Sequence, residues 1–493
     1  MDFDYFIKYY QSKCVYWETQ GIQTVWVGLW TRLTKPSHLW ELDLCRRFGK
    51  CFGIYELTQP VLYISDPVLI REVLVKAFDR FTNRRDFATG SDPMIDNSVA
   101  NLKGDQWKRV RSLMSPAFTT RKLKQMIPLI NQCLKTLDKN LSTVSTADCP
   151  SANETDTKRL FGAYSMEVII QVCFGTKVDA LLDEDNPIIS NAKKLFSFDF
   201  NTNLLILFLF PWLAKSLKLK IFDENSSKFF CNFTFQIIEE RRQQKQQQQQ
   251  LKSVDNIEKR VDFLQIMLES VSETSSIQYD NDNTDEFITN KTNKNKENYR
   301  ELTNDELLSQ CILFFIAGYE GPATTLSIIT YLLAKNPLVQ EKLYKEIDNY
   351  FKKNKDVDYD KLYSLKYLDA VIMESLRLYP SSTFLERVAT DDYTLSTGIQ
   401  IKKGHLIHIP VYSIHHDNTI YPDADQFLPE RFLANNVDQQ QQQQHNPYVY
   451  LSFGAGPRNC IGMRLAQMEI KLALANAIHK YRFIDTGLTL GLR

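Results

Sequence analysis

The sequence has little of several things, and each shortage excludes a class of protein. No window of 18 or more apolar residues occurs, so the sequence predicts no membrane-spanning helix. Lysine plus arginine and aspartate plus glutamate both number 59, and zero net charge gives no reason to expect a nucleic-acid partner. The 9 cysteines are widely spread without a C-x-x-C pair, which argues against a disulfide framework or a zinc finger. Glycine is scarce, with 17 residues among 493, yet it clusters in the stretch FGAGPRNCIG at 453–462.

The pattern of apolar residues predicts a mainly α protein with a minor β region. Thr303 and Glu306 have capping-box spacing, and a helical apolar pattern continues to Ala334 until Asn336-Pro337 ends it. Strand-like stretches at 61–64 and 405–411 predict a small sheet. Polar tracts near 243–251, 279–298 and 438–445 have little to bury and are expected to loop out.

One apolar stretch, residues 204–214, is followed by Lys215, Lys218 and Lys220. It is too short to span a bilayer, and Pro211 interrupts it. Two interpretations stay open: a core helix, or a surface segment that dips into a membrane with its lysines at the headgroups.

Cys460 differs from the other cysteines because glycines flank it and Arg458 lies just before it. Apolar residues from Ile461 to Ala475 repeat at helical spacing, which places the thiol at or just before a helix amino terminus. The helix dipole there favours a thiolate, and glycines allow a large flat group to approach. These features suit an axial iron ligand with a haem propionate alongside. A buried or redox-sensing thiol on a connecting turn is the alternative.

The pattern Phe453-x-x-Gly456-x-Arg458-x-Cys460-x-Gly462 resembles the haem-binding signature of the cytochrome P450 family. Other marks of the family follow in order, and they are Trp107-x-x-x-Arg111, Ala317-Gly318-Tyr319-Glu320, Glu374-Ser375-Leu376-Arg377 and Pro429-Glu430-Arg431-Phe432. The stretches 81–85, 161–169, 260–270 and 456–464 resemble the microsomal, drug- and steroid-oxidising family 3 branch and thromboxane synthase. The resemblance implies one haem-thiolate monooxygenase domain at 36–493, after an N-terminal segment at 1–35 without a clear membrane anchor.

The resemblance also implies roles for individual residues. Cys460 is the expected axial ligand of the iron in haem b (heme b), and Phe453 is expected to shield the thiolate side of the ring. The residues expected to hold the propionates are Arg84, Trp107, Arg111, Arg387 and Arg458. The residues expected to support the cysteine loop as a buried charge network, without taking part in chemistry, are Glu374, Arg377 and Arg431.

The substrate and O2 are expected on the distal face of the haem. The residues expected there are mostly apolar or neutral, which indicates a lipophilic substrate, and they are Val99, Ile316, Ala317, Ser382, Thr383 and Phe384. No glycine-rich dinucleotide fingerprint follows a strand, so electrons are expected from a partner of the NADPH–cytochrome P450 reductase type. The residues expected to face this partner, unless they are simply a solvated face, are Lys103, Lys108 and Arg109.

The sequence departs from the family at the proton relay. The family usually has threonine after Ala-Gly-x-Glu, whereas Gly321 and Pro322 follow Glu320 here. Glycine has no hydroxyl, and Pro322 is expected to kink the helix. Thr324, Thr325 or a water molecule is therefore expected to take over beside Glu320.

Three functions stay open. The first is a monooxygenase that inserts one oxygen atom from O2 into a lipophilic substrate. The second is an isomerase of a lipid (endo)peroxide, which needs neither a proton relay nor a reductase. The third is a non-catalytic haem-binding relic, suggested by the missing anchor and by an end at Arg493 before the family's usual pocket-closing strand pair. The expected location is the cytosolic face of the endoplasmic reticulum membrane, bound peripherally, or the cytosol because the usual anchor is missing.

Overall fold

The computed structural model describes residues 15–56, 59–86, 96–145, 156–175, 186–196, 203, 206, 211–220, 222–250, 262–270, 302–354, 359–433 and 446–487. The helices before residue 200 are α2 (Tyr16–Thr19), α3 (Leu29–Thr34), α4 (Ser37–Phe48), α5 (Pro67–Arg71), η1 (Glu72–Lys76), α7 (Gly104–Met114), η2 (Ser115–Phe118), α8 (Thr120–Ser145), α9 (Thr157–Phe174) and α10 (Pro187–Phe196). Those after it are α12 (Pro211–Ser216), α13 (Glu224–Gln250), α14 (Phe263–Ser270), α15 (Asn304–Lys335), α16 (Pro337–Lys353), α17 (Tyr359–Leu362), α18 (Lys366–Leu378), α19 (Val411–His415), η4 (Pro429–Phe432) and α20 (Met463–Lys480). The strands are β1 (Thr24–Val25), β2 (Cys51–Glu56), β3 (Gln59–Ile64), β4 (Leu385–Val388), β5 (Tyr393–Thr394), β6 (Gln400–Ile401) and β7 (Leu406–Ile409). The expected mainly α fold with a minor β region is confirmed.

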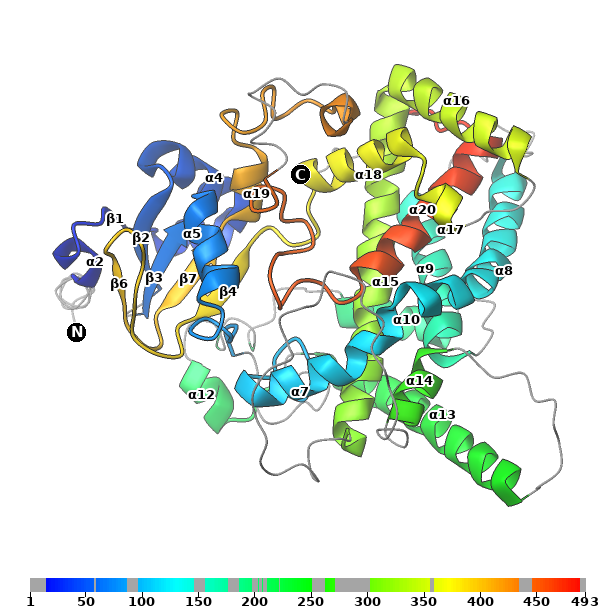
Figure 1. Cartoon of the computed structure of the whole chain (residues 1–493), viewed down its shortest axis with the longest axis horizontal. Helices are drawn as coiled ribbons and strands as arrows, with labels where there is room; N and C mark the ends of the chain where they lie inside the picture. Colours follow the sequence, from blue (N-terminus) through cyan, green and yellow to red (C-terminus); the bar gives the residue numbers. More distant parts are fainter. Residues whose placement is uncertain are drawn as a thin grey trace.

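The main sheet brings together two stretches that lie far apart in the chain. Its strand order is β1-β2-β3-β7-β4, and β3 and β7 run parallel with Tyr63 beside His408. Both predicted strands are present, although the second ends at Ile409 and α19 follows it directly. Strand β4 pairs antiparallel with β7, which places Glu386 opposite His408. In Figure 1 the sheet lies at one end of the molecule and helices make up the other.

Helix α15 is the longest among the described residues and runs through the helical part of the molecule (Figure 1). Its predicted capping box is present, because the Glu306 N–H donates to the Thr303 hydroxyl and the Thr303 N–H donates to the Glu306 carboxylate. The chain stays α-helical across Pro322, so the expected kink does not interrupt the helix. By length and composition α15 could cross a membrane, but half of its most apolar window is buried, as in a core helix.

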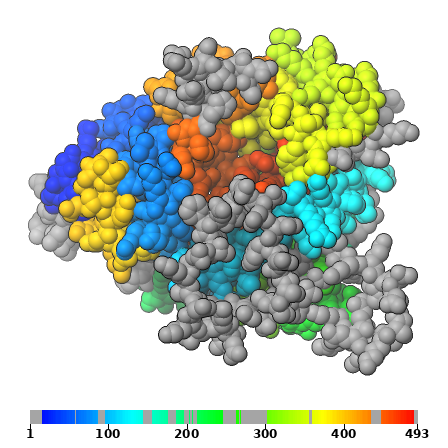
Figure 2. Space-filling view, in the orientation of Figure 1, coloured from blue at the N-terminus to red at the C-terminus, as the bar shows by residue number. Residues whose placement is uncertain are grey.

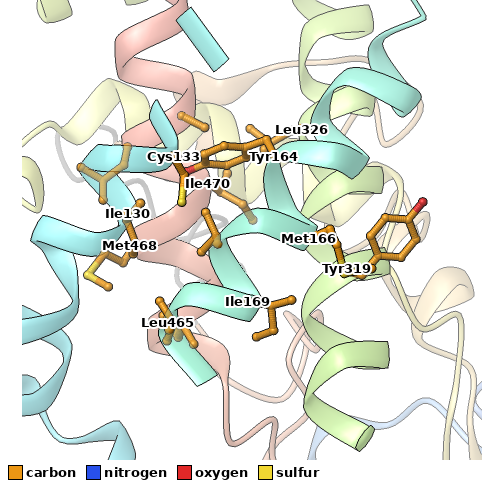
Figure 3. Close-up of a cluster of buried hydrophobic side chains, with 14 of the residues drawn as sticks. Ile130, Cys133, Tyr164, Met166, Ile169, Tyr319, Leu326, Leu465, Met468 and Ile470 are labelled. Atoms are coloured by element: carbon orange, nitrogen blue, oxygen red, sulfur yellow. The ribbon is translucent and has the colours of Figure 1, made fainter. Parts of the chain in front are cut away.

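Helix α9 lies against both α8 and α15 and is buried on all sides. Every residue from Leu160 to Phe174 is buried, as expected for a helix that other helices enclose. Gly318 allows α15 to approach closely, because a Cβ there would lie 2.4 Å from the Ile169 side chain. Figure 3 shows side chains of α8, α9, α15 and α20 meeting in one cluster, with Ile169 and Met166 from α9. This core fixes the position of α20, the helix that follows Cys460, relative to α15.

The first polar tract, at 243–251, was expected to loop out, but its described part is helical. Residues 243–250 continue helix α13 to Gln250. Glutamine is a good helix former, and extending an existing helix requires no new nucleus. The rest of this tract at 251 and the tracts at 279–298 and 438–445 lie outside the described residues. So does most of the apolar stretch at 204–214, where both interpretations stay open.

Candidate functional site

Two glycines bend the loop that carries Cys460. Gly454 and Gly456 both have a φ of 72°, in the left-handed region that favours glycine. A Cβ at Gly456 would also lie 2.1 Å from the carbonyl oxygen of Leu74, so a side chain cannot be placed there. The Cys460 N–H donates to the Phe453 carbonyl over 2.8 Å and closes the loop. Gly454 and Gly456 are therefore required by the backbone itself, whereas Gly462 has an ordinary φ of −86°.

The Cys460 thiol is accessible at its surface but lies among protein atoms. Its side chain is exposed, yet burial raises the pKa of the thiol. Both hold where the sulfur surface is accessible while protein atoms surround it at longer range. The Gly462 N–H, Arg111 and Arg84 oppose burial and lower the pKa. For the thiol by itself burial outweighs these stabilising groups, and α20 begins only at Met463. The expected thiolate ligand of an iron stays a prediction.

Three arginines meet beside this loop without a carboxylate to balance them: Arg84, Arg387 and Arg458. Arg387 is 1% exposed, and burial together with repulsion from Arg84 and Arg458 holds its pKa well below the usual range. Within the described part of the chain no carboxylate pairs with any of the three, and the buried Nε atoms of Arg387 and Arg458 have no hydrogen-bond partner. Buried charges are costly unless they are paired. The cluster therefore fits a ligand that brings two carboxylates, as the propionates of haem do.

The other two residues expected at the propionates lie in the same cluster. The Arg458 guanidinium lies 4.5 Å from the centroid of the Trp107 ring. Arg84 donates to the Arg458 carbonyl over 3.0 Å. Arg111 donates to the Asn459 side-chain oxygen over 2.9 Å, directly beside the cysteine. The structure thus brings together all the residues for which a propionate role was expected, with Trp107 supporting Arg458 through its ring face.

The expected support network is present behind the cysteine loop. Arg377 donates to Glu374 from Nε over 2.8 Å and from Nη2 over 2.9 Å, and both side chains are fully buried. Arg431 donates to the same carboxylate over 3.0 Å. Arg377 also donates to the carbonyls of His415 over 2.6 Å and Gln426 over 3.2 Å. One carboxylate therefore joins α18 to η4, and the arginine beside it also holds α19.

His415 links this network to the cysteine loop, and the sequence did not predict it. Its Nδ1 lies 3.0 Å from the Arg377 carbonyl, and its Nε2 accepts the Leu451 N–H over 2.9 Å. Burial lowers the pKa of His415 to about 3, so the ring is neutral near pH 7 and Nδ1 carries the proton. Ser452 donates its hydroxyl to the Leu376 carbonyl over 3.1 Å. The pair His415-His416 carries no sequence signal for such a link.

The acidic and hydroxyl side chains expected in the relay form a cluster with a lysine from α9. Thr324 donates to Glu320 Oε1 over 2.9 Å. Lys158 lies 2.5 Å from the same oxygen and also donates to the Thr324 hydroxyl. Thr325 instead donates to the Gly321 carbonyl over 2.8 Å and is buried. Thr324 is therefore the hydroxyl that lies beside Glu320, and Lys158 is a further member that sequence reasoning missed.

The residues expected at the substrate come from three segments. On α15, Ala317 is exposed in the middle of a core helix, and a Cβ at Gly321 meets no protein atom within 4 Å. Ile316 beside it is half-buried. Val99 is held against α15, because its N–H donates to the Gln310 side chain over 2.7 Å. Ser382, Thr383 and Phe384 form the turn before β4, where the Ser382 hydroxyl donates to the Phe384 carbonyl over 2.7 Å.

All three basic residues expected to face a partner form ion pairs within the protein. Arg109 pairs with Glu306 of α15 and is largely covered, so its expected outward role is wrong. Lys103 pairs with Asp86 over 2.5 Å. Lys108 lies 3.5 Å from Asp105 and remains exposed. Helix α7 therefore directs the Arg109 charge toward the protein interior, which the sequence pattern does not reveal.

A thiol beside an arginine cluster fits a ligand that carries a metal at one end and carboxylates at the other. Among the described residues, no atom comes within 4 Å of a Cβ at Gly462 either. A mainly helical fold with such a loop is that of a haem-thiolate protein. The family model "Cytochrome P450" matches residues 19–488, and the chain belongs to that family, whose members bind haem through a cysteine thiolate.

Individual relatives place the chain in the family 3 type. It is 38% identical to cytochrome P450 3A14 of Cavia porcellus over 458 residues, which cover 92% of this chain and 82% of the relative. Identity is 37% over 462 residues to cytochrome P450 3A9 of Rattus norvegicus, covering 92% and 83%. It is 36% over 461 residues to cytochrome P450 3A7 of Homo sapiens, covering 92% and 82%. The chain is accordingly a cytochrome P450 monooxygenase, and neither the isomerase nor the relic is favoured.

Proposed function

We propose that Cys460 is the axial ligand of the haem iron and that Arg84, Arg111, Arg387 and Arg458 bind the propionates. The observation that carries this assignment is the cluster of buried arginines without carboxylates beside the one thiol on a glycine-bent loop. When bound, a thiolate-ligated haem supplies the chemistry of O2 activation and O–O cleavage. The chain's own contribution is to hold the sulfur in place through the Phe453 carbonyl and to give the propionates their countercharges.

Proton delivery runs through Glu320 and Thr324 in this proposal. Gly321 has no hydroxyl, and Thr324 is the nearby threonine whose hydroxyl donates a hydrogen bond to the Glu320 carboxylate. Lys158 holds that carboxylate and hydroxyl together from α9. Because the side chains of Lys158 and Glu320 are about two-fifths exposed, at 42% and 41%, the cluster can exchange protons with water. The Thr324 hydroxyl of this cluster then passes protons to the face of α15 beside Gly321.

The substrate is a lipophilic organic molecule bound near Ala317, Ile316, Val99 and Phe384. Apolar side chains dominate this set, and Ala317 and Gly321 leave room beside α15. Lipophilic ligands gain most of their affinity from such surfaces, with a few polar groups to orient them. Ser382 and Thr383 are the polar members of the same set.

Electrons come from a reductase that docks on exposed basic side chains near the cysteine loop. Lys108 on α7 and Arg464 at the start of α20 are both exposed. Arg464 follows Cys460 closely and reaches α8, where it donates to Thr120 over 3.4 Å. The enzyme works at the cytosolic face of the endoplasmic reticulum membrane, to which it attaches peripherally.

The carbon-monoxide difference spectrum of the reduced protein tests the axial ligand. The wild-type protein should show the thiolate-type band, and Cys460→Ala should lose it. Cys51→Ala, which changes another free cysteine outside the site, should keep it. A thiolate-type band that persists in Cys460→Ala would disprove the assignment, and product formation with NADPH and a reductase then tests the reaction itself.

A further inference from the structure

A buried histidine lies between two carboxylates in the main sheet. His408 on β7 is 3% exposed. Its Nε2 lies 3.2 Å from Glu41 Oε1 on α4, and its Nδ1 lies 3.4 Å from Glu386 Oε1 on β4. Both nitrogens of an imidazole carry protons only in the cation. Both carboxylates lie within ion-pairing distance of the ring, and Nδ1 contacts Glu386 at hydrogen-bond distance, whereas Nε2 makes no hydrogen bond among the described residues and faces Glu41 through charge alone. The arrangement is therefore that of an imidazolium between two carboxylates.

Two aromatic rings enclose the same imidazole. The ring centroid of Tyr63 on β3 lies 4.2 Å from that of His408, with planes inclined by 26°. Phe384 stacks on His408 at 4.8 Å with an inclination of 23°. A cation against an aromatic face is attractive, and more so where water is excluded. Phe384 is also the residue that the proposed function places at the substrate.

The surrounding charges balance only when His408 is protonated. Arg85 donates to Glu386 from Nε over 2.9 Å and from Nη2 over 2.7 Å, and from Nη1 to Glu56 over 2.5 Å. The charged and titratable groups that form the network with His408 are Glu41 of α4, Glu56 of β2, Tyr63 of β3, Glu386 of β4, Arg32 of α3 and Arg85. Three carboxylates then face two arginines and one imidazolium. A neutral His408 leaves one buried negative charge without a counterion, which is costly.

We propose that the His408 imidazolium is a positioning residue for the substrate pocket. Clamped between Glu41 and Glu386, the imidazolium holds the Phe384 ring in place. This inference rests on the proposed function through the location of Phe384. Because side chains alternate along β4, Glu386 and the Phe384 ring stacked on His408 lie on one side of the sheet, while the next residue, Arg387, joins the arginine cluster at the cysteine loop on the other. The clamp therefore acts on the strand that carries both the pocket turn and a haem-binding residue.

Two ligands of the haem iron separate a pocket effect from a haem effect. 4-Phenylimidazole binds the iron and extends a phenyl group into the pocket, whereas imidazole binds the iron alone. In titrations followed by the Soret band, His408→Gln should weaken 4-phenylimidazole about 3- to 10-fold, the range expected for one lost cation–aromatic contact. Imidazole affinity and haem content should not change. His405→Gln, which alters a histidine stacked on Tyr16 near the other end of β7, should leave both ligands unchanged.

The ratio of the two affinities also reports the charge on His408. The two carboxylates raise the pKa of His408 to about 9, against the effect of burial. In the wild-type protein the preference for 4-phenylimidazole should therefore fall as the pH rises from 7.5 toward about 9.5. In His408→Gln the preference should not change with pH. Glu41→Gln removes one carboxylate and should lower the pH of this change, which gives a second variant if His408→Gln folds poorly. A preference that does not depend on pH in the wild-type protein would overturn the proposal, as would equal weakening of both ligands.

Histidine-selective nitrogen NMR tests the clamp without any catalytic readout. In the diamagnetic carbon-monoxide form, His408 should show two protonated ring nitrogens at pH 7.5, identified by their loss in His408→Gln. A single protonated nitrogen would overturn the proposal. A protein that takes up no haem would instead contradict the proposed function, and the NMR of that protein would still decide whether the imidazolium exists.

Discussion

Gly321 stands where the family usually has a threonine hydroxyl, and the structure leaves room for that side chain. A Cβ there meets no atom of the described residues within 4 Å, and its φ lies outside the left-handed region. We expect Gly321→Thr to fold and to raise the fraction of NADPH electrons that end in product, because a relay hydroxyl closer to the open face of α15 adds a proton path. General acid–base groups contribute about 10²–10⁴-fold in rate, so a partial gain in coupling is a modest expectation.

Coupling is measured as product formed against NADPH consumed, with hydrogen peroxide as the lost fraction. A peroxide-driven reaction provides the control, since it bypasses electron delivery. Equal coupling in both proteins at equal haem content would show that Thr324 already delivers protons as well as the family's usual residue.

Glu374 is the carboxylate that pairs with the two arginines of the network that supports the cysteine loop. It is fully buried and accepts hydrogen bonds from Arg377, Arg431 and the Leu428 N–H. Glu374→Gln leaves two buried guanidinium groups with a neutral partner, and breaking a buried ion pair costs roughly 3–5 kcal/mol. We expect lower haem content and a lower unfolding temperature, measured by the haem absorbance per protein and by calorimetry. Glu341→Gln on α16, an exposed partner of Lys345, should change neither.

The His415 link should make this element sensitive to acid. Burial lowers the pKa of His415 from 6.5 to about 3, so below pH 6.5 the unfolded chain binds a proton that the folded protein does not. The free energy of unfolding should therefore fall by about 1.4 kcal/mol per pH unit from this group alone between pH 6.5 and 4. In His415→Asn, which does not titrate, the wild-type slope should be reduced by about one proton, as measured by denaturant unfolding at several pH values. An unchanged slope would show that His415 is already accessible to protons in the folded protein.

Sequence patterns predicted the elements whose signals are local. The capping box at Thr303 and the stop before Pro337 define α15 because each uses residues within one helical turn. The glycine-bent loop of Cys460 is local as well, since its positive φ angles fall on the glycines themselves. The contacts that sequence reasoning missed join distant segments: Lys158 to Glu320, His415 to Leu451, and His408 to Glu41. A single sequence does not show which distant residues pair with one another. The ion pair of Arg109 with Glu306 was missed for the same reason.

At the scale of the whole molecule, ion pairs connect the sheet end to the segment that follows the apolar stretch. Arg32 and Arg85 both pair with Glu56, at 3.7 and 2.5 Å. The residue after Arg85, Asp86, pairs with Lys215 of α12 over 2.6 Å. Helices α3 and α12 are thereby held near one another. Exposed apolar side chains accompany both, because Trp30 of α3 is 78% exposed and Leu217, directly after α12, is 58% exposed.

This arrangement predicts that Trp30 contributes to peripheral membrane attachment. Exposed tryptophans favour the interface between water and lipid, and the exposed Lys218 supplies charge for anionic headgroups, while Lys215 and Lys220 are paired with Asp86 and Glu224. Trp30→Ser should weaken binding to vesicles of mixed neutral and anionic phospholipid by roughly tenfold, as expected when part of one large apolar side chain no longer enters the interface. Leu338→Ser is the matched control, because Leu338 is 81% exposed but begins α16, at the opposite end of the molecule from the sheet (Figure 1). Flotation of the purified protein with vesicles measures the binding, and alkaline carbonate should release the wild-type protein from cell membranes. Equal loss in both variants would show that exposed apolar area alone, and not this face, governs attachment, while retention after carbonate would contradict peripheral binding.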